Sequence, residues 1–199
     1  MNLKSSAFNL IQKQYEQQIK RPKEKPARQF LLCPVGLVAA GKTTVIKPLA
    51  KKLNLVRISS DGIRKILKNN NYNFDRVHGI VFTICEKYLN QGFSIAIDAD
   101  CVDAKKVKKI ENIAGKFQAK IFWIHINPPE KFIIEKIKRH KPTWLFPNKN
   151  IALRCYKIRK RLHQRLNFDF IYSFDTSKNN INKQIKEASL LIQKKLKKI

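Results

Sequence analysis

The sequence has 199 residues, of which 43% are hydrophobic, so it is long enough for one domain with a buried core and has a globular composition. No apolar run approaches the ~20 residues that a membrane-spanning helix needs, and residues 1–8 lack the apolar core of a secretory signal. The four cysteines are widely spaced without a CxxC pair, which argues against a zinc site or a disulfide framework. These features predict a cytoplasmic protein with reduced thiols.

The charge balance is strongly positive. Lys and Arg number 42 against 14 Asp and Glu, which gives a formal net charge of +28. Such a field attracts polyanions, and nucleic acid, anionic lipid and phosphorylated metabolites all qualify. The sequence is also rich in Lys, Asn and Ile together, as an AT-rich coding source produces. The charge is therefore either functional or compositional.

In chain order, residues 1–20 carry an incomplete apolar stripe that predicts a helix, and a charged linker with prolines follows. We therefore divide the chain into a helical appendage with its linker at residues 1–28 and a main domain at residues 29–199. Short apolar runs predict strands at residues 29–35, 56–58, 93–97, 119–126 and 170–174. Helical spacing predicts helices at residues 42–53, 62–68, 76–90, 103–116, 130–140, 151–166 and 181–198. This alternation predicts a parallel sheet with helices on both faces.

Residues 36–43 match the pattern GxxxxGK[ST] at every fixed position, directly after one predicted strand and at the start of a predicted helix. The two glycines let the backbone wrap a phosphate, the lysine reaches the β- and γ-phosphates, and the threonine hydroxyl binds Mg²⁺. Ala39 and Ala40 stand at positions where glycine or another small residue is common in such loops. Thr44 could instead cap or pack the helix. The expected nucleotide-binding residues are Gly36, Ala39, Ala40, Gly41, Lys42, Thr43 and Thr44.

Carboxylates follow two of the predicted strands, at the edge where ligands of parallel sheets gather. Asp61 is expected to act as the general base on an accepting hydroxyl, with an N-cap as its alternative role. Asp98 is expected to hold Mg²⁺ together with the P-loop threonine, and Asp100 to share that role or contact the substrate. Arg64 lies one helical turn after Asp61 and is expected either to bind an acceptor phosphate or to pair with Asp61. Asp103 is expected only to cap a helix.

A basic segment at residues 136–141 precedes a proline-bounded loop at residues 142–147, and more arginines follow up to residue 165. Two helices joined by such a loop predict a lid that carries cations over the γ-phosphate and excludes water. Arg139 is the lid residue expected to act in catalysis, although a solvated basic face is the alternative for most of these side chains. Trp144 and Phe146 are expected to pack on the domain, with base stacking as the alternative.

Together the P-loop, the segment Ser60-Asp61-Gly62-Ile63-Arg64, the strand that ends at Asp98 and the basic lid resemble the polynucleotide-kinase-like branch of P-loop kinases, over residues 29–175. This branch includes zeta-toxin-type sugar-nucleotide kinases and some antibiotic phosphotransferases. The resemblance implies a three-layer α/β/α sandwich of the nucleoside-kinase-like P-loop NTPase type, with a five-stranded parallel sheet and a helical lid. It also implies ATP and Mg²⁺ as cofactors, Asp61 as general base, Arg64 on an acceptor phosphate and Asp98 at the Walker-B position. The lid departs from the pattern, because Glu135 or Lys136 stands where a second arginine is common.

The expected function is a kinase that transfers the γ-phosphate of ATP to a hydroxyl of a nucleic-acid end, a nucleoside or a related small molecule. A sugar-nucleotide or antibiotic-type kinase shares every motif, and a non-catalytic, ATP-gated nucleic-acid-binding module is the alternative from another class. Polynucleotide binding would weaken steeply with salt, whereas binding of a small acceptor would weaken much less. The sequence leaves the acceptor, the preference for ATP over GTP and the oligomeric state open.

Overall fold

The computed structural model describes residues 5–139, 141–163 and 167–197. The strands are β1 (Phe30–Gly36), β2 (Val56–Ser59), β3 (Ile95–Asp98), β4 (Lys120–Ile126) and β5 (Phe170–Phe174). The helices are α1 (Ser5–Glu16), α2 (Lys42–Lys52), α3 (Ser60–Asn69), α4 (Val77–Asn90), α5 (Ala104–Lys116), α6 (Glu130–Lys138), α7 (Lys149–His163) and α8 (Ile181–Lys197). Each predicted strand and helix is present, with ends shifted by a few residues. The predicted helix ends at residues 1–4, 140, 164–166 and 198 lie outside the described residues.

The five strands form one parallel sheet in the order β2-β3-β1-β4-β5. Strand β1 lies in the middle, so the loop that follows it opens at the centre of the sheet edge. Residue Ser59 at the end of β2 pairs in register with Asp98 at the end of β3. The carboxyl ends of these two strands therefore bring their following residues to one place.

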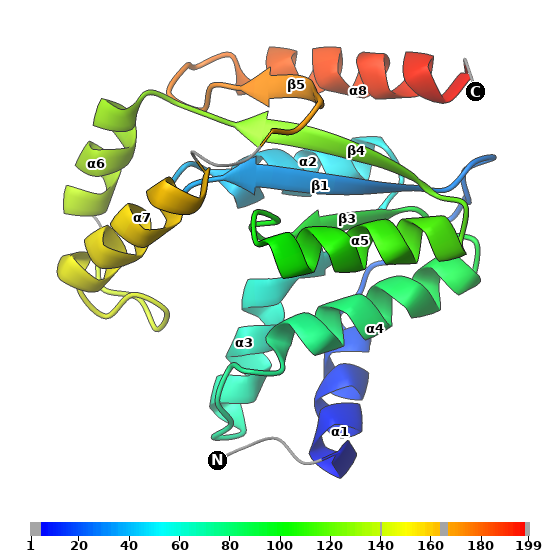
Figure 1. Cartoon of the computed structure of the whole chain (residues 1–199), viewed down its shortest axis with the longest axis horizontal. Helices are drawn as coiled ribbons and strands as arrows, with labels where there is room; N and C mark the ends of the chain where they lie inside the picture. The colour runs from blue at the N-terminus through cyan, green and yellow to red at the C-terminus, as the bar shows by residue number, and fades with distance from the viewer. Residues whose placement is uncertain (1–4, 140, 164–166, 198–199) are drawn as a thin grey trace.

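Alternating side chains of β1 fill two separate cores, one on each face of the sheet. Leu31 and Cys33 join the core covered by α1, α3, α4 and α5, while Phe30 and Leu32 join the core beneath α2 and α8. The fold is thus a three-layer α/β/α sandwich (Figure 1). Helices α6 and α7 pack against each other at one end of the sheet and form the helical lid. Within the described residues, no helix is both long and apolar enough to span a membrane.

The N-terminal helix α1 packs against α3 and α4 instead of standing apart from the domain. Ile11 is fully buried and Tyr15 is 6% exposed, and both belong to the core on that face. The Tyr15 hydroxyl accepts a hydrogen bond of 2.6 Å from the backbone N–H of Ser59, and burial raises the pKa of Tyr15 to about 12. The boundary at residue 28 stays a prediction, but α1 contributes to the core of the domain that follows it.

We expect Gly62→Ala to destabilise the protein even though alanine favours helices. A Cβ at position 62 would lie 2.8 Å from Cε2 of Tyr15, and the hydrogen bond to Ser59 holds that ring in place. Overpacking of this kind costs ~1–3 kcal/mol, which outweighs a gain of ~1 kcal/mol in helix propensity. Urea unfolding checks this, and the same substitution in a Tyr15→Ala background is expected to be neutral or stabilising. Equal destabilisation in both backgrounds would show that the ring is not the cause.

Candidate active site

The site is a cavity of about 480 Å³ at the carboxyl edge of the sheet, where the P-loop, the ends of β2 and β3 and the lid meet. Its walls include the P-loop and the acidic residues predicted from the sequence, together with side chains of α3, α4, α5 and α7. The residues from the sequence prediction that line it are Ala39, Gly41, Lys42, Thr43, Thr44, Asp61, Arg64, Asp98 and Asp100. Of the predicted nucleotide-binding residues, two do not line the cavity: Gly36 is the last residue of β1, and Ala40 is buried in the loop that follows.

The P-loop backbone takes a positive φ at one glycine, which permits it, and at one alanine, where it costs free energy. Gly41 precedes α2 with φ +93°, and Ala39 takes φ +63°, a left-handed conformation that costs an alanine ~1–2 kcal/mol. The Lys42 ammonium donates to the carbonyls of Gly36 at 2.7 Å and Leu37 at 2.8 Å. Burial lowers the pKa of Lys42, and the charges of Asp100, Asp61 and Asp98 oppose that shift. The loop therefore places a partly desolvated cation at the start of a helix, where phosphate binds well.

Thr176, in the loop after β5, supports the P-loop from behind. Its hydroxyl donates to the Ala40 carbonyl at 2.6 Å, and its side chain lies 3.1 Å from where a Cβ on Gly41 would stand. A bulkier residue at position 41 would therefore meet both an unfavourable φ and Thr176. No sequence motif marks Thr176, because its role depends on β5 lying beside β4.

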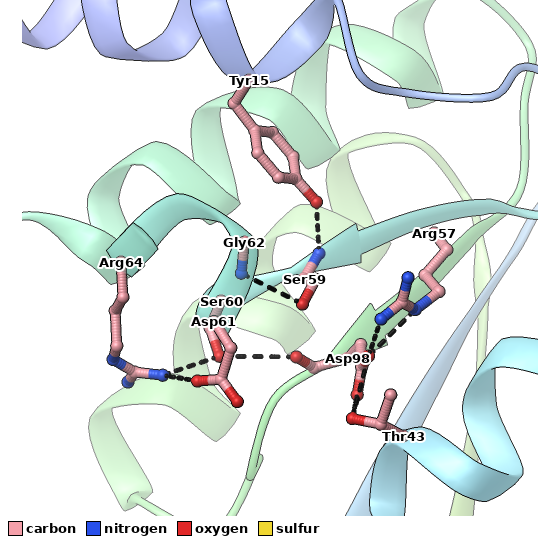
Figure 2. A network of polar contacts seen from close by, with 9 residues as sticks. All are labelled: Tyr15, Thr43, Arg57, Ser59, Ser60, Asp61, Gly62, Arg64 and Asp98. Carbon is pink, nitrogen blue, oxygen red and sulfur yellow. Dashed lines mark hydrogen bonds and ion pairs between the residues drawn. The ribbon is translucent and has the colours of Figure 1, made fainter. Parts of the chain in front are cut away.

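Asp98 is the centre of a buried polar network between the P-loop and β2 (Figure 2). Its carboxylate accepts hydrogen bonds from the Thr43 hydroxyl at 3.1 and 3.3 Å and from Nε of Arg57 at 2.9 Å, and the Arg57 guanidinium also forms an ion pair with it. Its backbone carbonyl accepts from the Ser60 hydroxyl at 3.4 Å. Asp98 is 5% exposed, so these bonds offset the cost of burying its charge. Arg57 was not predicted as part of the site.

The residues present fit a magnesium ion that arrives with a nucleotide. Mg²⁺ in such sites takes few protein ligands and keeps waters and phosphate oxygens, and here the Thr43 hydroxyl and the Asp98 carboxylate lie together facing the cavity. Among the described residues, no group of three or more His, Cys, Asp or Glu could hold a metal by itself. The donor set is therefore that of an ion shared with phosphates. The roles of Thr43 and Asp98 as metal ligands stay predictions.

Asp61 and Arg64 lie side by side at the start of α3, facing the cavity. Nη1 of Arg64 donates to Oδ1 of Asp61 at 2.6 Å and to the Ser60 hydroxyl at 3.0 Å. Ser59 is the N-cap of this helix, since its side chain accepts from the N–H of Gly62. The alternative role of Asp61 as an N-cap is therefore wrong, and its half-exposed carboxylate is available to a ligand. Asp103 does cap α5, as predicted.

Asp100 faces the cavity from the loop after β3 and contacts the lid. His163 Nε2 lies 3.3 Å from Oδ2 of Asp100, and Arg159 approaches the same oxygen at 3.9 Å. The other oxygen, Oδ1, is buried without a hydrogen-bond partner among the described residues. Burial opposes ionisation of Asp100, but the His163 contact and the charges of Lys42 and Arg159 outweigh it and lower its pKa. Asp100 therefore stays an anion that joins the sheet edge to α7.

The lid places a different arginine in the cavity from the one predicted. Arg139 follows the last residue of α6, is exposed and lies outside the cavity lining, whereas Arg159 of α7 lines it. The α7 arginines were recognised as basic lid residues, but helix spacing alone did not show which of them turns inward. The predicted lid residues His140 and Arg165 lie outside the described residues. Trp144 of the lid loop contacts Phe74 before α4, with ring centroids 6.4 Å apart, so this ring packs on the domain.

Two basic residues of the cavity were missed by the sequence analysis. His78 comes from the first turn of α4 and Lys106 from the first turn of α5. Neither lies in a motif, and the amphipathic pattern of each helix predicts only which side is buried. Burial, followed by the charges of Lys106 and Arg64, lowers the pKa of His78 to about 4.

We expect His78 to make the protein less stable as the pH falls from about 6.5 to about 4. The pKa of His78 is lower in the folded than in the unfolded protein, so the unfolded chain binds more protons within that window. Urea unfolding at several pH values checks this against His78→Gln, which cannot titrate. Identical pH dependence in the two proteins would contradict it.

The loop after a central strand, the lysine and threonine that open α2 and the aspartate that ends β3 together define a P-loop NTPase with a kinase-like fold. The chain belongs to the AAA domain family AAA_33, whose model matches residues 31–143. Among curated protein sequences, none matches this chain. Arg159 and His163 lie beyond the matched segment.

Solved structures with the same fold include several kinases. The APS kinase CysC of Mycobacterium tuberculosis, determined with AMPPNP and APS, is 13% identical with a TM-score of 0.59, and the match covers 84% of this chain and 99% of that one. A gluconokinase from Sinorhizobium meliloti 1021 is 10% identical with a TM-score of 0.57, covering 83% and 92%. The shikimate kinase of Aquifex aeolicus is 12% identical with a TM-score of 0.51, covering 82% and 96%. At these identities the likeness shows the shared fold.

Proposed function

We propose that the protein is an ATP- and Mg²⁺-dependent kinase that transfers the γ-phosphoryl group to a hydroxyl of a small molecule. One observation supports this above the others, namely that three sets of residues line the same cavity. They are the P-loop lysine Lys42, the pair Thr43 and Asp98, and the pair Asp61 and Arg64. Nucleotide binding alone requires the first two. The third, Asp61 with Arg64, supplies what an acceptor hydroxyl needs.

In the proposed reaction, Asp61 accepts the proton of the acceptor hydroxyl as its oxygen attacks the γ-phosphorus, and the bond from phosphorus to the bridging oxygen of ADP breaks. Lys42 stabilises the charge that develops on the β- and γ-phosphates. Magnesium, when bound, neutralises phosphate charge beside Thr43 and Asp98. Arg159 of the lid adds a cation near the transferring group and helps to exclude water.

This proposal differs from the polynucleotide-kinase-like resemblance in the size of the acceptor. The net charge of +28 favours a nucleic acid, whereas a cavity of about 480 Å³ shared by both substrates favours a small acceptor. The structural neighbours named above are an APS kinase, a gluconokinase and a shikimate kinase, and each of these names refers to a small molecule. We therefore place the small acceptor first and keep a 5′-hydroxyl polynucleotide as the alternative.

A transfer screen tests the function. Radiolabelled [γ-³²P]ATP with Mg²⁺ is offered to sugars, sugar phosphates, nucleosides, nucleotide sugars and 5′-hydroxyl oligonucleotides in parallel, with Lys42→Ala as the blank. We expect label on one small-acceptor class, lost in the variant. Label only on oligonucleotides, with a steep salt dependence, would favour the alternative. Nucleotide binding without transfer to any acceptor would count against a kinase.

The same assay compares the two lid arginines. Arg159→Met is expected to lower transfer more than Arg139→Met, because only Arg159 lines the cavity. A larger loss with Arg139→Met would mean that Arg139, and not Arg159, supplies the arginine of the lid that transfer requires.

A further inference from the structure

Three basic side chains meet on the acceptor side of the cavity from three different helices. Arg64 comes from α3, His78 from α4 and Lys106 from α5, and all three line the cavity. Lys42 and Arg159 already serve the triphosphate in the proposed function. The three basic residues therefore exceed what nucleotide binding requires.

Lys106 is a half-buried cation whose ammonium makes no direct hydrogen bond or ion pair among the described residues, although the charges of Asp103 and Asp100 act on it. Burial, followed by the positive charge of Arg159, lowers its pKa, and the carboxylates of Asp103 and Asp100 oppose this shift without cancelling it. A cation that has lost water without gaining a direct hydrogen-bond partner is costly, and an anion in contact with it would offset that cost. Lys106 is thus placed to receive an anion from the cavity.

Arg64 and His78 add donors to the same place. Arg64 uses Nη1 for its contacts with Asp61 and Ser60, and a guanidinium carries further N–H groups for a second anion. Burial, together with the positive charges of Lys106 and Arg64, lowers the pKa of His78 to about 4, so its imidazole is neutral near pH 7. A neutral imidazole still offers one N–H donor. Donors from three helices that line one cavity suit a tetrahedral dianion better than a planar carboxylate, which a single guanidinium can hold.

The lid loop limits the size of an acceptor that can bind beside these three basic residues. Leu145 and Phe146 of the lid loop line the cavity, and Trp144 reaches across to Phe74 on the acceptor side. An acceptor in this place therefore lies between the sheet edge and the lid loop.

We propose that His78 and Lys106 extend the acceptor-phosphate contact that the resemblance implies for Arg64, so that the three side chains form one anion subsite and the substrate is a small hydroxyl compound already bearing a phosphate monoester. The subsite deepens the proposed function and rests on it for the reaction, but it makes its own binding prediction. With the phosphate held here, the hydroxyl on the same molecule points toward Asp61.

The first test uses inorganic phosphate as the probe. Protein is saturated with AMP-PNP and Mg²⁺ so that the P-loop is filled, and phosphate is titrated while the imidazole signals of His78 are followed by NMR. We expect a saturable shift in the wild type and at least ~10-fold weaker binding in Lys106→Met. Lys106→Arg is expected to retain binding, and Lys105→Met, an exposed lysine next to it, to match the wild type. No shift of His78 in the wild type, or equal affinity in Lys106→Met, would overturn the subsite.

AMP-PNP affinity is measured separately, so failure of nucleotide binding and failure of the subsite are distinguishable. If AMP-PNP does not bind, the phosphate titration is repeated in Lys42→Ala, where the P-loop no longer competes.

The second test compares transfer to matched pairs with and without the phosphate, such as glycerol 3-phosphate against glycerol and ribose 5-phosphate against ribose. We expect kcat/KM to favour the phosphorylated member of an accepted pair by at least ~10-fold, and Lys106→Met to remove that preference. Preference for unphosphorylated compounds or for 5′-hydroxyl oligonucleotides would overturn the proposal.

Discussion

Asp61→Asn is expected to lower the rate of phosphoryl transfer by about 10²–10⁴-fold while leaving the affinity for Mg²⁺ and AMP-PNP close to that of the wild type. The amide keeps the shape of the side chain and can still accept from Arg64, but it cannot take a proton from the acceptor. Asp61 makes no hydrogen bond to Thr43 or Asp98, the pair proposed to bind the metal, so we expect the nucleotide site to stay intact. Single-turnover transfer and AMP-PNP titration check the two halves of this expectation.

A matched carboxylate elsewhere controls for a general effect of charge. Glu111 is exposed on α5 and lies outside the cavity lining, so Glu111→Gln is expected to transfer phosphate as fast as the wild type. Equal rates for Asp61→Asn and the wild type on every accepted substrate would remove Asp61 from the reaction. A loss of nucleotide affinity equal to the loss of rate would assign it to binding instead.

Asp98→Ala is expected to lower the free energy of unfolding by about 2–3 kcal/mol and to abolish the dependence of nucleotide binding on Mg²⁺. The substitution leaves the Arg57 guanidinium, which is 30% exposed, without its buried carboxylate and removes a hydrogen-bond partner of Thr43. The partial exposure of Arg57 keeps the loss below that of a fully buried pair. Urea unfolding and AMP-PNP titrations with and without Mg²⁺ measure the two effects.

Removing both charges separates stability from metal binding. In Asp98→Ala with Arg57→Met, no cation is left unpaired, so we expect much of the stability to return while the Mg²⁺ dependence stays lost. If the double variant remained as unstable as Asp98→Ala, the uncompensated arginine would not be the cause. If it regained a Mg²⁺ dependence, Asp98 would not be a metal ligand.

The sheet and most helix positions could be predicted because the hydrophobic pattern has a different period in each kind of element. The apolar runs of β1 and β4 and the glycines around the P-loop leave few other choices. Helix α1 was harder to place, because its incomplete stripe suggests a weak surface helix. Its burial depends on Tyr15 meeting the backbone of Ser59, a contact between residues 44 positions apart in the sequence.

The candidate site likewise contains some residues that could be predicted from the sequence and others that could not. Residues in motifs with fixed spacing, such as Lys42, Asp61 and Asp98, could be proposed from the sequence and line one cavity in the structure. Arg159, His78 and Lys106 could not, because each is one basic residue among 42 Lys and Arg or four His, and only packing decides which ones turn inward. In a chain with so many basic residues, the sequence cannot single out Lys106, whereas its burial in the cavity wall does.

The place of α1 in the core has a consequence for how the chain is made. During synthesis α1 leaves the ribosome before its partners α3 and α4, which begin at Ser60 and Val77. A helix of 12 residues is marginal in water by itself, so it gains stable partners only after much of the P-loop half has emerged. Helix α1 is therefore translated well before the contacts that hold it can form, and Ser59, the N-cap of the helix that carries Asp61, gains its hydrogen bond to Tyr15 only when α1 packs.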